Sequence, residues 1–423
     1  MNKKLQAKWI QSLHDSSWDT VRSLLPEDLD QTARDMNALR RRREVPNAEA
    51  LVRIILAYVV SGLSIKDVAA WAAASGIAEL TGEGIFYRLV VSEQWLRHLL
   101  CQVLLANIVA ASGNALCEKL RLRVADATVI VGPKAKGTEW RVHTLIDPRS
   151  ANICTLELTD EHVGEGFARF PVEPGDVLMG DCIYSAARSV YSVHDRGGYA
   201  IARFSPASLR LCNPQRERVP VSQWESGIPQ AGVVSWDLRL PIPPQDENGK
   251  AKAGWKLANA AGWIPVRVLA ARTPKGTIIW IISTLPVDLA TPEQLLELYR
   301  IRWQIELVFK RLKSLMDLDE LRSRHQGPTA KSWILGKLLA AALAQRMLTP
   351  DEDSSPGDIP SKWDEHQPSL WSEFRMAFLA LQRLVLGIGA LSAIRIQEYR
   401  IRLRASPRKR LPQHMPAWCD ALF

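Results

Sequence analysis

The spacing of hydrophobic residues changes along the chain, and up to about residue 118 it is helical. In EALVRIILAYVVSG the apolar positions recur every three or four residues, as on one face of an α-helix. The next helix is expected to begin at Ser64, because Ser64 and Asp67 have the spacing of a capping box. A short turn and a further helix carrying Tyr87 and Arg88 follow. Two helices joined in this way are typical of a helix-turn-helix, and equally of an ordinary helical hairpin.

Beyond residue 118 the period shortens to two, which is the pattern of half-buried β-strands. Five runs are predicted to be strands, with a helical stretch, SAARSVYSVHDRGG, before the last of them. This order predicts an α/β core with a mixed sheet. Residues 204–288 hold further β-like runs among many Pro, Gly and Trp residues, so we expect a β-rich insertion there. The five strands are KLRLRVADATVIV, WRVHTLID, ANICTLELT, DVLMGDCIYS and YAIARFS.

The basic residues suggest an anionic partner. The 423 residues include 54 Lys and Arg against 45 Asp and Glu, which gives a net charge of +9. The excess is concentrated in Arg40 to Arg43 and in a stretch from Arg395 to Arg410, where Glu398 is the only acidic residue. A charge run is often no more than a solvated face. Two clusters dominated by Arg favour phosphate contact instead, because a guanidinium forms bidentate pairs with phosphate oxygens.

Cysteine spacing and hydropathy exclude several classes of protein. The six cysteines form no CxxC pair, so neither a zinc ribbon nor a disulfide framework is expected, and reduced thiols in a cytoplasmic protein are the simpler interpretation. The N-terminal stretch has no apolar signal core, and no apolar run is long enough to span a membrane.

Three carboxylates are candidates for a shared site. Asp126 is predicted at the end of the first strand of the α/β core and Asp181 at the end of the fourth, so both reach one edge of the sheet if those strands are neighbours. Glu306 lies on a later helix. Three such groups repel one another unless a cation neutralises them, and oxygen ligands suit Mg²⁺ or Mn²⁺. The alternatives are a turn or cap role for each Asp and a surface ion pair between Glu306 and Lys310.

The helix predicted for LYRIRWQIELVFKRLK has an unusual polar face. Tyr299, Arg302, Glu306 and Lys313 are spaced by three, four and seven residues, which places a phenol, a guanidinium, a carboxylate and an ammonium on one stripe. The opposite side is apolar, with Ile301, Ile305, Val308, Leu312 and Leu315.

This stripe resembles a known signature. The pattern Y-x2-R-x3-E-x6-K is similar to the YREK signature of DDE transposases from bacterial insertion sequences. DAT at Asp126 resembles the first-Asp motif of that family, and GDCIYS at Asp181 resembles the second, with Tyr184 at its aromatic position. LTDEHVGE is similar to the connecting segment, and the insertion 204–288 matches in place and character. The resemblance covers residues 1 to about 350. One departure is Ile183, where the family often has Gly.

The resemblance implies an RNase H-like catalytic core in which Asp126, Asp181 and Glu306 are the catalytic residues. It also implies that these three carboxylates are the ligands of two Mg²⁺ or Mn²⁺ ions.

 From the residues alone, two such ions would activate an attacking oxygen and stabilise a leaving oxygen in phosphoryl transfer.

The same resemblance implies a set of contacts to the DNA end. Tyr299, Arg302 and Lys313 lie on the stripe of the metal ligand and are expected to grip the DNA beside the metals. Trp280 in GTIIWIIS is expected either to stack on a base flipped out of the element's end or to be a core side chain. Arg203, after the fifth strand, is a further candidate for a phosphate contact.

The sequence therefore predicts a cut-and-paste DNA transposase. Its partners are expected to be the double-stranded DNA of the element's ends and of the target, with a homodimer pairing two ends and no membrane. The alternatives are a catalytically silent DNA-binding protein derived from a transposase and an unrelated metal-dependent nuclease or phosphohydrolase. The predicted division is a helical DNA-binding domain (1–118), a catalytic domain (119–350), a linker (351–370) and a helical, basic C-terminal region (371–423).

Overall fold

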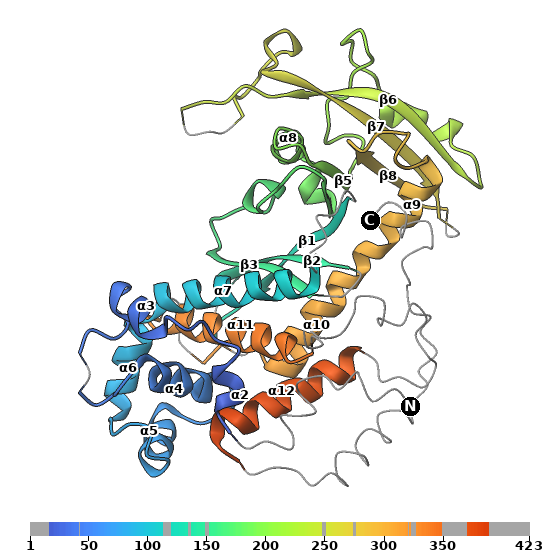
Figure 1. Ribbon diagram of the computed structural model, residues 1–423. Coiled ribbons are helices and arrows are strands. Elements are labelled where there is room, and N and C mark those ends of the chain that lie inside the picture. The colour runs from blue at the N-terminus through green and yellow to red at the C-terminus, as the bar shows by residue number, and fades with distance from the viewer. Residues whose placement is uncertain are drawn as a thin grey trace, which may run out of the picture.

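The fold is taken from a computed structural model (Figure 1). It describes residues 17–41, 43–112, 120–133, 137–148, 152–247, 251–273, 276–319, 321–322, 327–348 and 370–388. Arg42, the basic stretch 395–410 and all but the last residue of the predicted linker lie outside the described residues.

The N-terminal region is helical, as predicted. The capping box at Ser64 is confirmed, because its side chain accepts a hydrogen bond from the Asp67 backbone N–H and the Asp67 carboxylate accepts one from the Ser64 N–H. The stretch EGIFYRLVVSEQWLRHLL forms two helices and not one, because the helix is interrupted at Ser92. The helices are α2 (Asp19–Arg22), α3 (Leu29–Asp35), α4 (Ala48–Val60), α5 (Ile65–Ala74), α6 (Gly82–Val91) and α7 (Glu93–Ser112).

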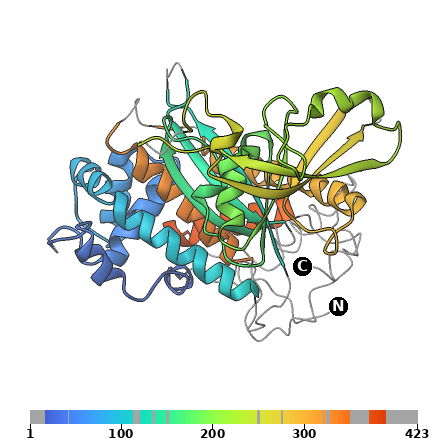
Figure 2. The ribbon, with the colours of Figure 1, turned by 90° about the horizontal axis from the view of Figure 1, so that it is seen from above.

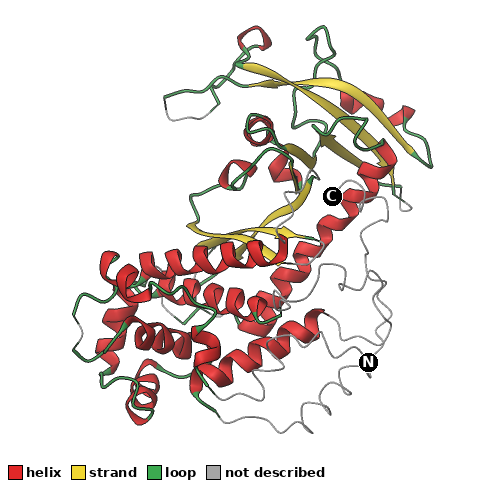
Figure 3. Ribbon diagram, in the orientation of Figure 1, coloured by secondary structure: helices red, strands yellow, loops and turns green. Residues whose placement is uncertain are grey.

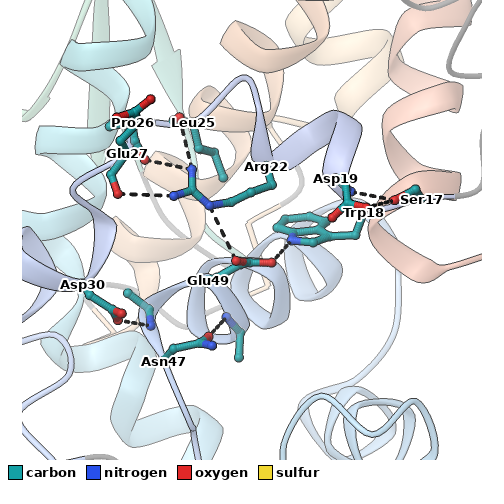
Figure 4. Close-up of polar contacts among 12 residues, drawn as sticks. Ser17, Trp18, Asp19, Arg22, Leu25, Pro26, Glu27, Asp30, Asn47 and Glu49 are labelled. Carbon is teal, nitrogen blue, oxygen red and sulfur yellow. Dashed lines mark hydrogen bonds and ion pairs between the residues drawn. The ribbon is translucent and has the colours of Figure 1, made fainter.

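Polar contacts fix the first described segment to α4 (Figure 4). The Trp18 indole N–H donates to Glu49 at 2.7 Å, and the Arg22 guanidinium lies 3.5 Å from the same carboxylate. Asn47 caps α4 by accepting from the Ala50 N–H, and Asp30 accepts from the N–H of Ala48. The start of α4 is thereby tied to both preceding helices.

The predicted α/β core is confirmed as part of one mixed, eight-stranded sheet of order β3-β2-β1-β4-β5-β8-β7-β6. Strands β1, β2 and β3 form an antiparallel meander, and β4 and β5 add to β1 in parallel. Helix α8 (Ala187–His194) connects β4 to β5, as parallel neighbours require. The five core strands are β1 (Arg121–Ile130), β2 (Trp140–Asp147), β3 (Asn152–Asp160), β4 (Asp176–Gly180) and β5 (Tyr199–Arg203).

The β-rich insertion extends this sheet and is not a separate one. Its strands are β6 (Val233–Ile242), β7 (Gly262–Arg272) and β8 (Ile278–Ser283), and β8 pairs antiparallel with β5. Seen from above, the insertion and the N-terminal helices lie at opposite ends of the molecule (Figure 2).

The helices cover one face of the core sheet more heavily than the other (Figure 3). Helices α7 and α11 (Ala330–Arg346) pack against each other and on β3, and α12 (Leu370–Leu386) packs on α11 and α4. One continuous hydrophobic core joins these helices to the sheet, so residues 17–112 share their core with the α/β region. A second core on the other face holds α8 and the insertion strands. No described helix has the length and hydropathy to cross a membrane.

The helix predicted through residues 298–313 is interrupted. Helix α9 (Pro292–Arg300) ends in a short 3₁₀ turn, η5 (Ile301–Trp303), before α10 (Gln304–Met316) begins. The apolar side is buried at Ile301 and Ile305, as expected. The interruption places Arg302 in the 3₁₀ turn, and such turns within helices often mark a hinge.

Candidate active site

Strand register brings Asp126 and Asp181 together. Strands β1 and β4 pair in parallel, and the last pair places Val124 opposite Met179. Asp126 and Asp181 each lie two residues further along, so the same register places them opposite each other. Asp181 directly follows β4, as predicted. Asp126 is not at the end of its strand, because β1 continues to Ile130 along β2. The site therefore opens where β4 stops and β1 continues.

The turn after β4 holds Asp181 in place. Asp181 is the N-cap of the 3₁₀ helix η2 (Cys182–Ser185), and its Oδ1 accepts a hydrogen bond of 2.9 Å from the Ile183 N–H. The Ile183 side chain is 53% exposed, and its backbone is not among the described residues with positive φ. This turn therefore does not require the Gly that the family often has there.

Gly180 is required by packing. A Cβ at this position would lie 2.5 Å from Cγ of Tyr184, whose ring is fully buried over the strand end. The ring also packs on Phe167, with centroids 4.9 Å apart. The Gly and the aromatic residue of GDCIYS thus fit each other and fix the turn that carries Asp181.

We expect Gly180→Ala to destabilise the protein by about 1–3 kcal/mol, because the Tyr184 ring must shift to admit the methyl group. The midpoint of thermal unfolding should fall by several degrees. Gly227→Ala is the matched control, since nothing lies within 4 Å of its Cβ position. Equal melting temperatures for the two variants would contradict this account of the turn.

Arg302 links the first and third carboxylates. Its Nη1 lies 3.7 Å from Oδ2 of Asp126, and its Nη2 donates to Oε1 of Glu306 at 3.1 Å. The Arg302 side chain is 21% exposed, whereas that of Glu306 is 47% exposed. Glu306 is therefore at the mouth of the site, and the sheet carboxylates lie deeper.

The environment of Asp126 favours its protonated form. Burial raises the pKa of Asp126 to about 6, the hydrogen bond of 2.8 Å from the Ala127 N–H opposes the rise, and the Asp181 carboxylate adds to it. A nearby cation would stabilise the ionised form of this carboxyl, because the carboxyl is buried and lies close to a second carboxylate.

Tyr299 and Arg203 border the same site. Burial raises the pKa of Tyr299 to about 12, and the charges that act on it include Arg302, Asp181 and Arg203. Arg203 is exposed at the end of β5. Two of the predicted DNA-contacting residues thus lie beside the carboxylates.

Two other predicted residues lie apart from this cluster. Lys313 is half-buried on α10, seven residues and about 10 Å of helix beyond Glu306. Trp280 is only 4% exposed, stacked 6.0 Å from Trp236 and edge-on to Phe204. The structure thus has Trp280 as a core side chain, which is one of its two predicted roles.

Glu165, for which the sequence predicted no role, also borders the site. Burial raises the pKa of Glu165, the ion pair with Arg141 at 3.2 Å opposes the rise, and the Asp181 charge adds to it. The signal was present in LTDEHVGE, the stretch that resembles the connecting segment of the family.

No three His, Cys, Asp or Glu side chains of the described residues stand together as the ligands of one metal ion. The position of Arg302 explains this for Asp126 and Glu306, because its guanidinium contacts both carboxylates. Asp126 and Asp181 are neighbours across two strands, and Arg302 lies between Asp126 and Glu306.

Comparison with known proteins identifies the family. Residues 118–343 match the family model described as a transposase DDE domain. The chain belongs to the DDE transposase family. The putative transposase InsL for insertion sequence element IS186A of Escherichia coli (strain K12) is 32% identical to it over 370 residues, which cover 81% of this chain and 96% of that protein.

Two other sequence relatives, from Escherichia coli and Bacillus thuringiensis, agree with this assignment. The transposase for insertion sequence element IS421 of Escherichia coli is 32% identical over 371 residues, with 81% and 96% of the two chains covered. The transposase for IS231F of Bacillus thuringiensis subsp. israelensis is 25% identical over 380 residues, with 76% and 77% covered. Among solved structures, a piggyBac transposase synaptic complex with hairpin DNA has 9% identity and a TM-score of 0.43, with 96% of this chain and 87% of that chain covered. This DDE transposase is thus an enzyme that acts on DNA phosphodiester bonds.

Proposed function

We propose that this DDE transposase binds the terminal inverted repeats of its own insertion sequence, cuts the element out and joins it to target DNA. The proposal rests on the convergence of three carboxylates: Asp126 and Asp181 lie side by side on adjacent strands, and Arg302 joins Asp126 to Glu306 on α10. Hydrolysis would free the 3′-OH of the element's end, and this hydroxyl would then attack a target phosphodiester.

The donor set of the site fits divalent cations. Carboxylate oxygens are the ligands that Mg²⁺ and Mn²⁺ prefer, and the Arg302 guanidinium already occupies a cation's position between two of them. Asp126, Asp181 and Glu306 would hold two such ions. When bound, the ions activate the attacking oxygen and stabilise the leaving oxygen.

The side chains around the carboxylates would position the DNA end. Arg302 and Arg203 carry charge suited to the phosphates that flank the scissile bond, and the Tyr299 phenol can donate a hydrogen bond to the backbone. Lys313 would contact a phosphate about two helical turns away along α10.

The base-holding role considered for Trp280 requires an accessible ring face, which a side chain 4% exposed does not offer. Trp224 and Trp236 are half-buried, with ring centroids 4.6 Å apart, and line an open surface hollow of about 630 Å³ in the insertion. In our proposal these two rings receive an unpaired base, and Trp280 supports Trp236 from behind.

Helix α6 is the proposed recognition helix, because it presents Phe86 and Tyr87 with 43% and 60% of their surface exposed. Tyr87→Ser is expected to weaken binding to the inverted repeat by about 1–3 kcal/mol, as the loss of a base or backbone contact should. The measurement is a binding titration at fixed salt. Tyr191→Ser, on α8, is the control because Tyr191 pairs with Asp195 away from α6. Unchanged affinity for the Tyr87 variant would remove α6 from the interface.

The test of this function is a complete reaction. The protein, a linear DNA carrying two inverted repeats, a supercoiled target plasmid and Mg²⁺ should yield a strand-transfer product, and a dimer on paired ends is expected. A catalytically silent DNA-binding protein would bind the repeats without product. A phosphohydrolase of another class would act on small phosphate esters without binding DNA, and its activity would not respond to the repeats.

The raised pKa of Asp126 predicts a pH-dependent stability. The folded-state pKa of about 6 lies above the ordinary value of 3.8, so stability is lost as the pH rises through this window. In EDTA at pH 8, Asp126→Asn should therefore raise the free energy of unfolding by on the order of 1–3 kcal/mol, and at pH 3.5 by little. Chemical denaturation at both pH values measures this. A variant less stable than wild type at pH 8 would show that ionised Asp126 is not costly to the fold.

A further inference from the structure

Arg302 contacts the oxygens that the proposed function assigns to metal. Its Nη1 lies 3.7 Å from Asp126 and its Nη2 lies 3.1 Å from Glu306, so one guanidinium spans two carboxylates that come from a strand and a helix. The Asp126 side chain is 18% exposed, and a charge in such a place is costly unless an opposite charge is near.

We propose that Arg302 is a resident cation of the catalytic site, which neutralises Asp126 and Glu306 until a DNA phosphate draws its guanidinium away and leaves the carboxylates to Mg²⁺. This inference rests on the proposed function, because it takes the two carboxylates as metal ligands. It adds that metal binding is coupled to DNA binding through one side chain.

Competition for the same oxygens gives the coupling its direction. Oδ2 of Asp126 and Oε1 of Glu306 cannot be directed at a guanidinium and at a metal ion together. A phosphate offers Arg302 an alternative partner, because two N–H groups of a guanidinium fit two phosphate oxygens. DNA therefore favours metal binding, and linkage requires that metal favours DNA binding by the same factor.

The backbone around Arg302 is a short 3₁₀ turn, which would allow its side chain to change position. Arg302 lies in η5, the 3₁₀ turn between α9 and α10, and its neighbour Tyr299 is partly buried and packs against the hydrophobic core. A long side chain on such a turn can turn between carboxylate and phosphate while the two flanking helices stay packed.

The experiment measures Mn²⁺ binding to the full chain by electron paramagnetic resonance of free Mn²⁺, with and without an inverted-repeat duplex. Asp126→Asn with Asp181→Asn gives the background of ions held by DNA itself. Wild type should bind Mn²⁺ at least about tenfold more tightly with DNA than without it. Without DNA, Arg302→Gln should bind Mn²⁺ about tenfold more tightly than wild type does. Addition of DNA should change the Mn²⁺ affinity of this variant only slightly.

Two further variants separate charge from fold. Arg302→Lys keeps one positive charge without the fork and should fall between wild type and Arg302→Gln. Arg300→Gln removes an exposed charge two residues away on α9 and should behave as wild type.

If Arg302→Gln and Arg302→Lys bind Mn²⁺ without DNA no more tightly than wild type, the inference is wrong. This result would not contradict the proposed metal site itself. Wild type that binds no Mn²⁺ above background, even with DNA, would overturn the inference together with the proposed function.

Discussion

Asp126→Asn, Asp181→Asn and Glu306→Gln should each reduce cleavage at the element's end by on the order of 10³-fold or more, while binding to the inverted repeat should stay within a few-fold of wild type. Each variant keeps the shape of its side chain and loses the charge that a metal ligand needs. Binding is preserved because many phosphate contacts share the affinity. The effect is large because removing one ligand disturbs both ions of a two-metal site.

Matched carboxylates exist nearby as controls. Asp288 is exposed just before α9, and Glu293 is exposed in the first turn of that helix. Asp288→Asn and Glu293→Gln should cut at the wild-type rate. Cleavage and binding are measured on the same labelled duplex with Mg²⁺. A site variant that cuts as fast as its control would remove that residue from the catalytic set.

Arg302→Ala and Lys313→Ala should slow cleavage by about 10–100-fold and weaken binding by only a few-fold, because these residues orient the DNA end and supply little of the total affinity. Misplacement of a scissile phosphate by about 1 Å can cost 10²-fold in rate. Arg302→Ala should have a second effect, because removal of the guanidinium should also tighten metal binding without DNA.

Lys310→Ala is the control on the same helix, because Lys310 is exposed on α10. The assay compares initial cleavage rates at saturating protein with affinities from titrations. If the Arg302 and Lys313 variants cut as fast as Lys310→Ala, the polar stripe is a solvated helix face and its mechanistic interpretation is wrong.

Local patterns in the sequence were sufficient for most of the core. The alternating runs around Leu122, Val142 and Leu156 became strands because each buries one face, and DVLMG became a central strand because both its faces are covered. The neighbouring positions of Asp126 and Asp181 followed from the sequence only on the condition that their strands are neighbours, and the parallel pairing of β1 with β4 meets that condition.

Features set by tertiary contacts could not be read in the same way. The break at η5 and the continuation of β1 past Asp126 depend on pairing and packing partners distant in sequence. Trp280 and Trp236 look alike in a β-like run, and only the sheet shows which ring is covered. The ion pair of Arg302 with Asp126 joins residues that no spacing rule connects.

The central claim is that three carboxylates of this transposase form a metal-dependent site that cuts at the element's end. Mapping the break at nucleotide resolution on a duplex with one inverted repeat tests it most directly. The account predicts a 3′-OH at the last nucleotide of the element with Mg²⁺, no break with EDTA, and no break with Asp181→Asn. Cleavage that persists in EDTA, or in the Asp181 variant, would contradict it.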